Sequence, residues 1–188
     1  MQIETTRFGV VTVADDRVLS FPKGLLGFPA CTRWVLIESL ETDDAAADAG
    51  DTQNFFWWLQ SADEPTLAFV VTDPALFVGA YRVPVHADQL ERLGVRDAAE
   101  TQSFVIVNKV NDTLTGNLQG PLVINVAERR GEQLVLSDRR FTTRVPLMQV
   151  GPNAPTPTPA PASVAKPAPA KTVVRTAAPR PRTAAAVA

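Results

Sequence analysis

The sequence has 188 residues, of which 45% are hydrophobic and 20% are charged, which fits one globular domain with additional sequence. Residues 1–150 hold 13 Lys and Arg against 20 Asp and Glu, a net charge of −7, whereas residues 151–188 hold five basic residues and no acid. Because an acidic body repels nucleic acid and favours basic partners, the composition argues against direct nucleic-acid binding.

The sequence has the features of a cytoplasmic protein. Cys31 is the single cysteine and cannot form an internal disulfide, and residues 1–13 lack the basic and then apolar order of a signal peptide. The longest apolar runs, such as residues 67–71, are far shorter than the roughly 18 residues needed to span a bilayer. We therefore expect a reducing compartment and no membrane segment.

The body predicts an all-β fold, because short runs of β-branched and aromatic residues alternate with turn-forming residues. The expected strands are residues 2–6, 10–13, 17–21, 34–38, 55–61, 67–72, 81–85, 103–110, 115–119, 122–127, 134–136 and 141–145. One stretch, residues 88–93, has a helical period, and Gly94 can close its last turn. The prediction is a small antiparallel β-barrel-like domain with one short helix.

Two segments have compositions that do not predict a packed structure. Residues 39–54 are rich in Asp, Glu and Ala, and we expect a mobile acidic loop there. Residues 151–188 contain nine prolines and no aromatic residue, which predicts a disordered, Pro/Ala-rich basic tail. The expected organisation is one domain over residues 1–150 and a tail over 151–188.

Three sequence blocks are similar to a known family. They are FPKGLLGFP at residues 21–29, FWWLQS at 56–61 running through LAFVVTDP at 67–74, and NLQGPLVIN at 117–125 followed by RGEQLVL at 130–136. In their order, and over most of residues 2–147, they resemble the FliW family of flagellar assembly factors. The resemblance implies a β-barrel-like fold and two competing partners, which are flagellin, through its C-terminal region, and the translational repressor CsrA.

The resemblance also implies a regulatory switch. Cytoplasmic flagellin would hold the factor and leave the repressor active on flagellin translation, and export of flagellin would release the factor to capture the repressor. We therefore expect a protein-binding regulator that couples flagellin synthesis to export, with no enzymatic activity and no cofactor.

Two groups of apolar residues are candidate partner contacts. Side chains alternate across residues 55–61, so both faces carry aromatic rings, and either the strand is buried on both sides or one aromatic pair is exposed as a binding anchor, with Trp57 as the candidate contact residue. Leu76, Phe77 and Tyr81 are large residues on an irregular segment. They can form a groove for the apolar face of a flagellin helix, or they can simply pack.

Polar residues supply two further candidates. Asn117 and Gln119 lie beside Pro121, where amides can bond local backbone or donate to an added partner segment. Acidic pairs, Asp63-Glu64 and Asp43-Asp44, can screen the basic RNA-binding face of the repressor, or they are solvated turn charges.

Catalytic and nucleic-acid roles have weaker support. His86 is the only histidine, and Cys31 has no histidine near it in sequence, so a hydrolase or small-ligand barrel needs an apolar pocket that brings polar groups together beside one of them. The arginines near the end of the body, Arg130 among them, lack interleaved aromatic residues and are best explained as hairpin-flanking charges. A third alternative is a scaffold in which the tail binds the partner.

Overall fold

The computed structural model describes residues 1–38, 55–79 and 81–150. The expected acidic loop at 39–54, with its pair Asp43-Asp44, and the expected tail at 151–188 lie outside these described residues. Within the described part, no helix has the length and apolar character needed to cross a membrane.

Strands are the main regular secondary structure of the described chain, as the sequence predicts. The strands are β1 (Gln2–Thr5), β2 (Gly9–Thr12), β3 (Leu19–Ser20), β4 (Arg33–Glu38), β5 (Trp57–Ser61), β6 (Ala68–Thr72), β7 (Thr101–Val110), β8 (Thr113–Gly116), β9 (Leu122–Asn125), β10 (Arg130–Gln133) and β11 (Val145–Gln149). In the part of the chain that the structure describes, one α-helix, α1 (Ala87–Leu93), and short 3-10 helices at Asp15–Arg17, Pro74–Leu76 and Ala98–Glu100 connect the strands.

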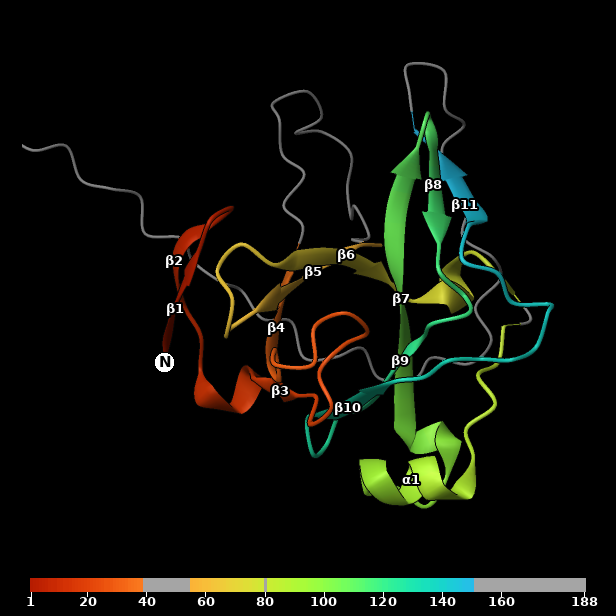
Figure 1. Cartoon of the computed structure of the whole chain (residues 1–188), viewed down its shortest axis with the longest axis horizontal. Coiled ribbons are helices and arrows are strands. Elements are labelled where there is room, and N and C mark those ends of the chain that lie inside the picture. Colours follow the sequence, from red (N-terminus) through yellow and green to blue (C-terminus); the bar gives the residue numbers. More distant parts are fainter. Residues whose placement is uncertain (39–54, 80, 151–188) are drawn as a thin grey trace, which may run out of the picture.

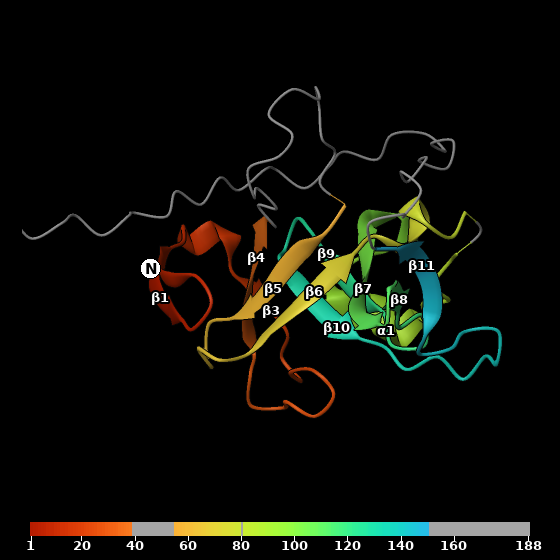
Figure 2. The same ribbon diagram turned by 90° about the horizontal axis from the view of Figure 1, so that it is seen from above.

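The large sheet of the described chain closes into a barrel (Figures 1 and 2). Its order is β11-β8-β7-β6-β5-β4-β3-β10-β9, and β9 also pairs with the long strand β7. β7 has room for three partners, because residues 101–104 pair with β9, residues 105–107 with β6 and residues 107–110 with β8. All these ladders are antiparallel except the single β10–β3 pair between Arg130 and Ser20.

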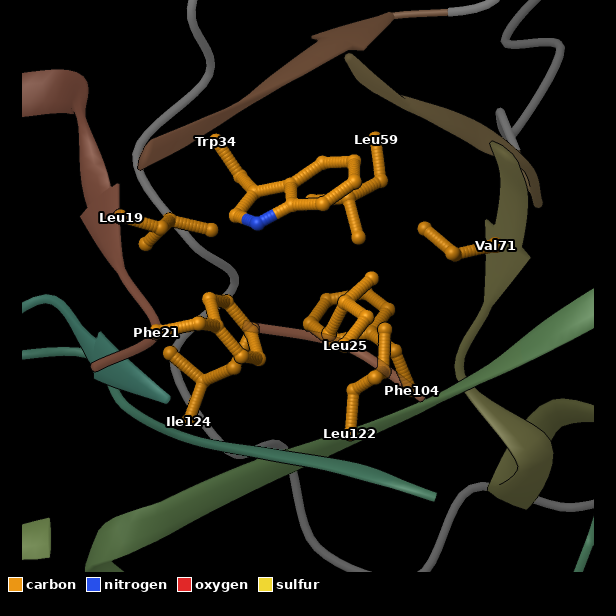
Figure 3. Packing of buried hydrophobic residues seen from close by; sticks show 9 residues of the cluster. All are labelled: Leu19, Phe21, Leu25, Trp34, Leu59, Val71, Phe104, Leu122 and Ile124. Carbon is orange, nitrogen blue, oxygen red and sulfur yellow. The ribbon is translucent and has the colours of Figure 1, made fainter. Parts of the chain in front are cut away.

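Within the described residues, three clusters of buried side chains hold the domain together. The largest fills the barrel and contains Leu19, Phe21, Leu25, Trp34, Leu59, Val71, Phe104, Leu122 and Ile124, which point toward one another in Figure 3. A second cluster, which includes Ile3, Val11 and Val35, lies under the β1–β2 hairpin. A third, which includes Leu93 and Val123, packs α1 against the barrel.

The short helix forms where its end signals predict. His86 is the N-cap, and its backbone N–H donates to Gln89 Oε1 at 2.8 Å. Gly94 ends the helix at φ 70°, the left-handed conformation that glycine adopts without strain. The side chain of Asn125 donates to the Leu93 carbonyl at 2.9 Å, so β9 holds the end of α1.

The strand expected at residues 81–85 is wrong. The predicted alternation is present, since Tyr81, Val83 and Val85 are half-buried and Arg82 and Pro84 are exposed. However, this segment is not a strand of the described sheets, and Pro84 has no N–H to donate. The segment packs mainly by its side chains, and its first residue, Tyr81, donates its backbone N–H to the Val78 carbonyl at 3.0 Å.

The last two expected strands are misplaced. β10 precedes residues 134–136, where Leu134 and Leu136 are buried and donate single bonds to the carbonyls of Pro121 and Gln119. β11 starts at Val145, where the expected strand 141–145 ends. For residues 134–136, the alternation of hydrophobic residues correctly indicates which positions are buried. It does not indicate where a continuous ladder of hydrogen bonds between strands forms.

Candidate partner-binding surfaces

β5 carries tryptophans on both of its faces, and both faces are covered. The Trp57 ring contacts Phe104 edge-on at 5.7 Å, beside the barrel core. On the other face, Trp58 contacts Phe8 at 5.8 Å, and the Arg7 guanidinium lies 4.2 Å from the Trp58 ring centre. Trp57 is half-buried and not a freely projecting anchor. Its contact with a partner stays a prediction.

Phe77 joins two other phenylalanines to form a group that we call the aromatic cluster, which comprises Phe55, Phe56 and Phe77. The Phe77 ring lies 5.7 Å from Phe56 in a stacked geometry and 6.1 Å from Phe55 in an edge geometry. The 3-10 helix Pro74–Leu76, capped by the Asp73 carboxylate at 2.9 Å from the Ala75 N–H, brings Phe77 to this position. All three rings keep part of their surface in solvent.

Tyr81 has different neighbours. Its hydroxyl donates to the Leu118 carbonyl at 2.9 Å, and its ring meets Phe141 edge-on at 5.3 Å. Burial raises the pKa of the Tyr81 hydroxyl well above its ordinary value. Tyr81 therefore contacts the segments around β8 and β11, whereas Phe77 contacts the approach to β5. Leu76, also half-buried, lies next to Phe77 in the chain.

The polar residues of the third block serve local backbone. Asn117 Oδ1 accepts a hydrogen bond from the Gly120 N–H at 3.0 Å, which shapes the turn before β9. Pro121 is buried, and the carbonyls of Gln119 and Pro121 accept from Leu136 and Leu134. These bonds account for Asn117 and Pro121 structurally, and a partner contact by them or by Gln119 stays a prediction.

Asp63 and Glu64 lie on the connection between β5 and β6, and we call residues 61–67, from the last residue of β5 onward, the acidic turn. Ser61 Oγ accepts from the backbone N–H groups of Asp63 at 3.1 Å and Glu64 at 3.0 Å. Glu64 is exposed and accepts hydrogen bonds from Thr66, through its N–H and its hydroxyl. The Glu64 carboxylate is therefore held only by hydrogen bonds from Thr66, within the same turn, and it is accessible to a partner.

The Asp63 carboxylate has a structural role that the sequence did not reveal. It accepts hydrogen bonds from the N–H groups of Thr32 at 2.7 Å and Arg33 at 2.9 Å, and Arg33 Nε lies 2.7 Å from its second oxygen. Partial burial favours the neutral acid, but the bonds from Arg33 and Thr32 outweigh it and hold the pKa of Asp63 below its ordinary value. The carboxylate thus fixes the acidic turn to the start of β4.

We predict that Asp63→Asn destabilises the fold by about 1–2 kcal/mol near neutral pH, because it weakens bonds to an ionised acceptor. Because the pKa of Asp63 is lower in the folded chain than in the unfolded chain, its ionised carboxylate stabilises the fold at pH values above the unfolded pKa of about 3.9. This stabilisation is lost as pH falls through the folded pKa. The difference between the two proteins should therefore shrink toward about pH 3. Urea unfolding over this range measures it, with the exposed Asp16→Asn as control. A difference independent of pH would contradict the electrostatic explanation.

One residue that matters for the acidic turn was missed altogether. Gln60 is fully buried, and its Nε2 donates to the carbonyls of Ser61 at 2.9 Å and Leu67 at 3.0 Å, at the two ends of the turn. The sequence feature that could have identified Gln60 is its position two residues after Trp58, which places a polar side chain on a strand face otherwise lined with aromatic residues. Gln60 positions the turn that presents Glu64.

The candidate catalytic residues lie in separate places. Cys31 precedes β4 and packs against the barrel core, and His86 is the exposed N-cap of α1. Within the described residues, no group of three or more His, Cys, Asp and Glu is suited to hold a metal. The geometry therefore gives no support to the hydrolase alternative.

Comparison with known proteins gives one consistent result. Residues 2–147 match the family model described as FliW protein. A flagellar assembly factor FliW from Syntrophus aciditrophicus is 33% identical over 151 residues, which cover 79% of this chain and 89% of the relative. One from Geobacter sulfurreducens is 35% identical over 150 residues, 78% of this chain and 86% of the relative.

A solved structure agrees with the sequence relatives. The crystal structure of a flagellar assembly factor FliW superposes with a TM-score of 0.66 at 27% identity, and the match covers 78% of this chain and 96% of that one. The family-model match over residues 2–147 contains the closed barrel, the aromatic cluster and the acidic turn. The chain therefore belongs to the FliW family of flagellar assembly factors.

Proposed function

We propose that the chain is a cytoplasmic, non-enzymatic regulator that binds flagellin, through the C-terminal region of flagellin, and in competition binds the translational repressor CsrA. The observation that carries this proposal is the family match over residues 2–147, which spans the closed barrel and every candidate contact residue. Binding of flagellin then leaves CsrA active, and export of flagellin frees the factor to relieve repression of flagellin translation.

The aromatic cluster is the surface that we assign to flagellin. Its three rings are held in place by mutual contacts at 5.7 and 6.1 Å, yet each keeps exposed area. Rigid aromatic groups of this kind give large contact area with little loss of conformational entropy on binding. The apolar face of an amphipathic helix is the matching partner surface.

The acidic turn is the surface that we assign to CsrA. Glu64 is exposed, and the turn is fixed by Gln60, Ser61 and Asp63, so its charge is presented in a set position. A carboxylate held against a basic RNA-binding face removes phosphate contacts, and RNA affinity falls with each one lost. Because Asp63 supports the fold, Glu64→Gln is the variant that isolates charge from structure.

Calorimetric titration of the full chain tests the proposal directly. The chain is titrated with flagellin from the same organism, then with CsrA, and then with each in the presence of the other. Tight and mutually exclusive binding supports the switch. Absence of binding to both would show that the chain has the family fold without these partners, and simultaneous binding of both would remove the competition.

We predict that Phe77→Ala weakens flagellin binding at least tenfold, because it removes the ring that stacks on Phe56 and leaves the cluster loose. The same titration measures the effect. Phe8→Ala is the control, since Phe8 is another half-buried aromatic residue with an edge contact, but it lies in the turn of the β1–β2 hairpin. Equal losses in both variants would point to general destabilisation and not to a flagellin contact at Phe77.

A further inference from the structure

A small hollow lies away from the aromatic cluster and the acidic turn. It forms where the turn at Pro22–Gly24, the end of α1 at Leu93, and β10 meet. Its volume is about 40 Å³, which is room for roughly three water-sized groups. The backbone and apolar side chains of Pro22, Gly24 and Leu93 make up much of its wall, so its interior favours an apolar group.

The acid on the wall of this hollow is already paired. Glu132 accepts from Lys23 Nζ at 2.9 Å and from Arg92 Nε at 2.9 Å, and Arg92 also bonds Asp88 at 2.7 Å. Partial burial favours the neutral acid, but the bonds from Arg92 and Lys23 outweigh it, so the pKa of Glu132 lies below its ordinary value. Glu132 therefore stays ionised and holds both basic groups at the rim.

Arg130 is the cation that this network does not use. Side chains alternate along β10, so Arg130 and Glu132 lie on one face of the strand. Gly131 faces the opposite way, toward the ring of Phe21, because a Cβ added to Gly131 would lie 2.7 Å from Phe21 Cε1. Arg130 is exposed, and within the described residues its guanidinium has no hydrogen-bond or ion-pair partner. The hollow thus combines an apolar interior with an available guanidinium at its edge.

We propose that this hollow binds the last residue of a partner chain, with an apolar side chain in the hollow and the terminal carboxylate on Arg130. The hollow is small, so it can take only the tip of an aliphatic side chain such as leucine or valine. A guanidinium binds a carboxylate through two parallel hydrogen bonds, and a terminal residue supplies carboxylate and side chain from one Cα. The rim carries three basic groups and two acidic groups, so its local charge is positive, whereas residues 1–150 as a whole have a net charge of −7. The rim is therefore a local site for an anion. This site goes beyond the proposed function and does not require flagellin to be the partner.

Two small probes test the site on the ¹⁵N-labelled full chain. N-acetyl-leucine carries the side chain and the carboxylate, and N-acetyl-leucinamide carries the side chain alone. We expect N-acetyl-leucine to shift the amide signals of Gly24, Leu93 and Gly131 in a saturable manner, at least fivefold more tightly than the leucinamide. Arg130→Gln should weaken binding of N-acetyl-leucine at least fivefold. Arg139→Gln, which changes another exposed arginine outside the hollow, should leave it unchanged.

Three results would overturn the proposal. A lack of saturable shifts at the three amides would show that the hollow does not take this ligand. Equal affinity for the leucinamide, or an unchanged affinity in Arg130→Gln, would remove the role of the carboxylate. Tighter binding of the blocked peptide acetyl-Leu-Asp-Gly-amide, which has an internal acid and no free terminus, would assign the hollow to an internal acidic segment instead.

Discussion

Replacing Gly24 by alanine is expected to lower the free energy of unfolding by about 2–5 kcal/mol, from a backbone strain of roughly 1–2 kcal/mol and a packing conflict of roughly 1–3 kcal/mol. Gly24 has φ 63°, where a Cβ meets its own backbone. An added Cβ would also lie 2.7 Å from Pro29 Cα and would run into the Phe28 carbonyl oxygen. Since the obstacles are backbone atoms, no side chain can rotate away to relieve the conflict.

Gly27→Ala is a matched control for this prediction. Gly27 lies in the same loop at φ 85°, but an added Cβ meets nothing within 4 Å. Its loss should be limited to backbone strain, roughly 1–2 kcal/mol. Urea unfolding of both variants measures the difference. If the two losses are equal, the close approach between Gly24 and residues 28–29 does not limit the fold, and positive φ alone explains why glycine is needed.

The fold could be predicted because its strands follow local rules. Alternation of apolar residues and short turn signals place nearly every strand from β1 to β9 close to its position, and the end signals at Asp88 and Gly94 place α1. The pattern failed where side chains alternate without a ladder. The backbone N–H groups of Tyr81 and Leu134 donate to single carbonyls, those of Val78 and Pro121, outside any ladder, and such pairings leave no period in the sequence.

The candidate sites were harder to predict, because their geometry depends on contacts between distant segments. Two aromatic residues in succession show that both faces of β5 are apolar, but only the folded chain shows that Phe104 and Phe8 cover them. Asp63 is a turn residue by every local signal, yet its carboxylate bonds the start of β4, about 30 residues earlier. Nothing near Asp63 in the sequence indicates this partner.

Replacing Gln60 by glutamate is expected to cost about 3–5 kcal/mol near neutral pH, the range found when a buried charge lacks a partner. Gln60 is fully buried, and four carbonyl oxygens surround its Nε2, those of Ser61 and Leu67 at 2.9 and 3.0 Å and those of Glu64 and Pro65 at 3.4 Å. A carboxylate would face these carbonyls with acceptors only. Its other oxygen would take the place of Gln60 Oε1, which has no hydrogen-bond partner among the described residues.

The pH dependence of Gln60→Glu separates charge from shape. Burial and the surrounding carbonyls raise the folded-state pKa of the introduced acid above its unfolded value of about 4.3. Below the unfolded value the acid is neutral in both states, and as pH rises toward the folded value the unfolded chain is increasingly favoured. The loss relative to the parent protein should therefore be smaller near pH 4 than near pH 7, because the neutral acid can donate one hydrogen bond. Gln2→Glu, on the exposed face of β1, should change stability by less than about 0.5 kcal/mol. A loss in Gln60→Glu that stays constant with pH would mean that the site tolerates the charge, and that the turn is held chiefly by Ser61 and Asp63.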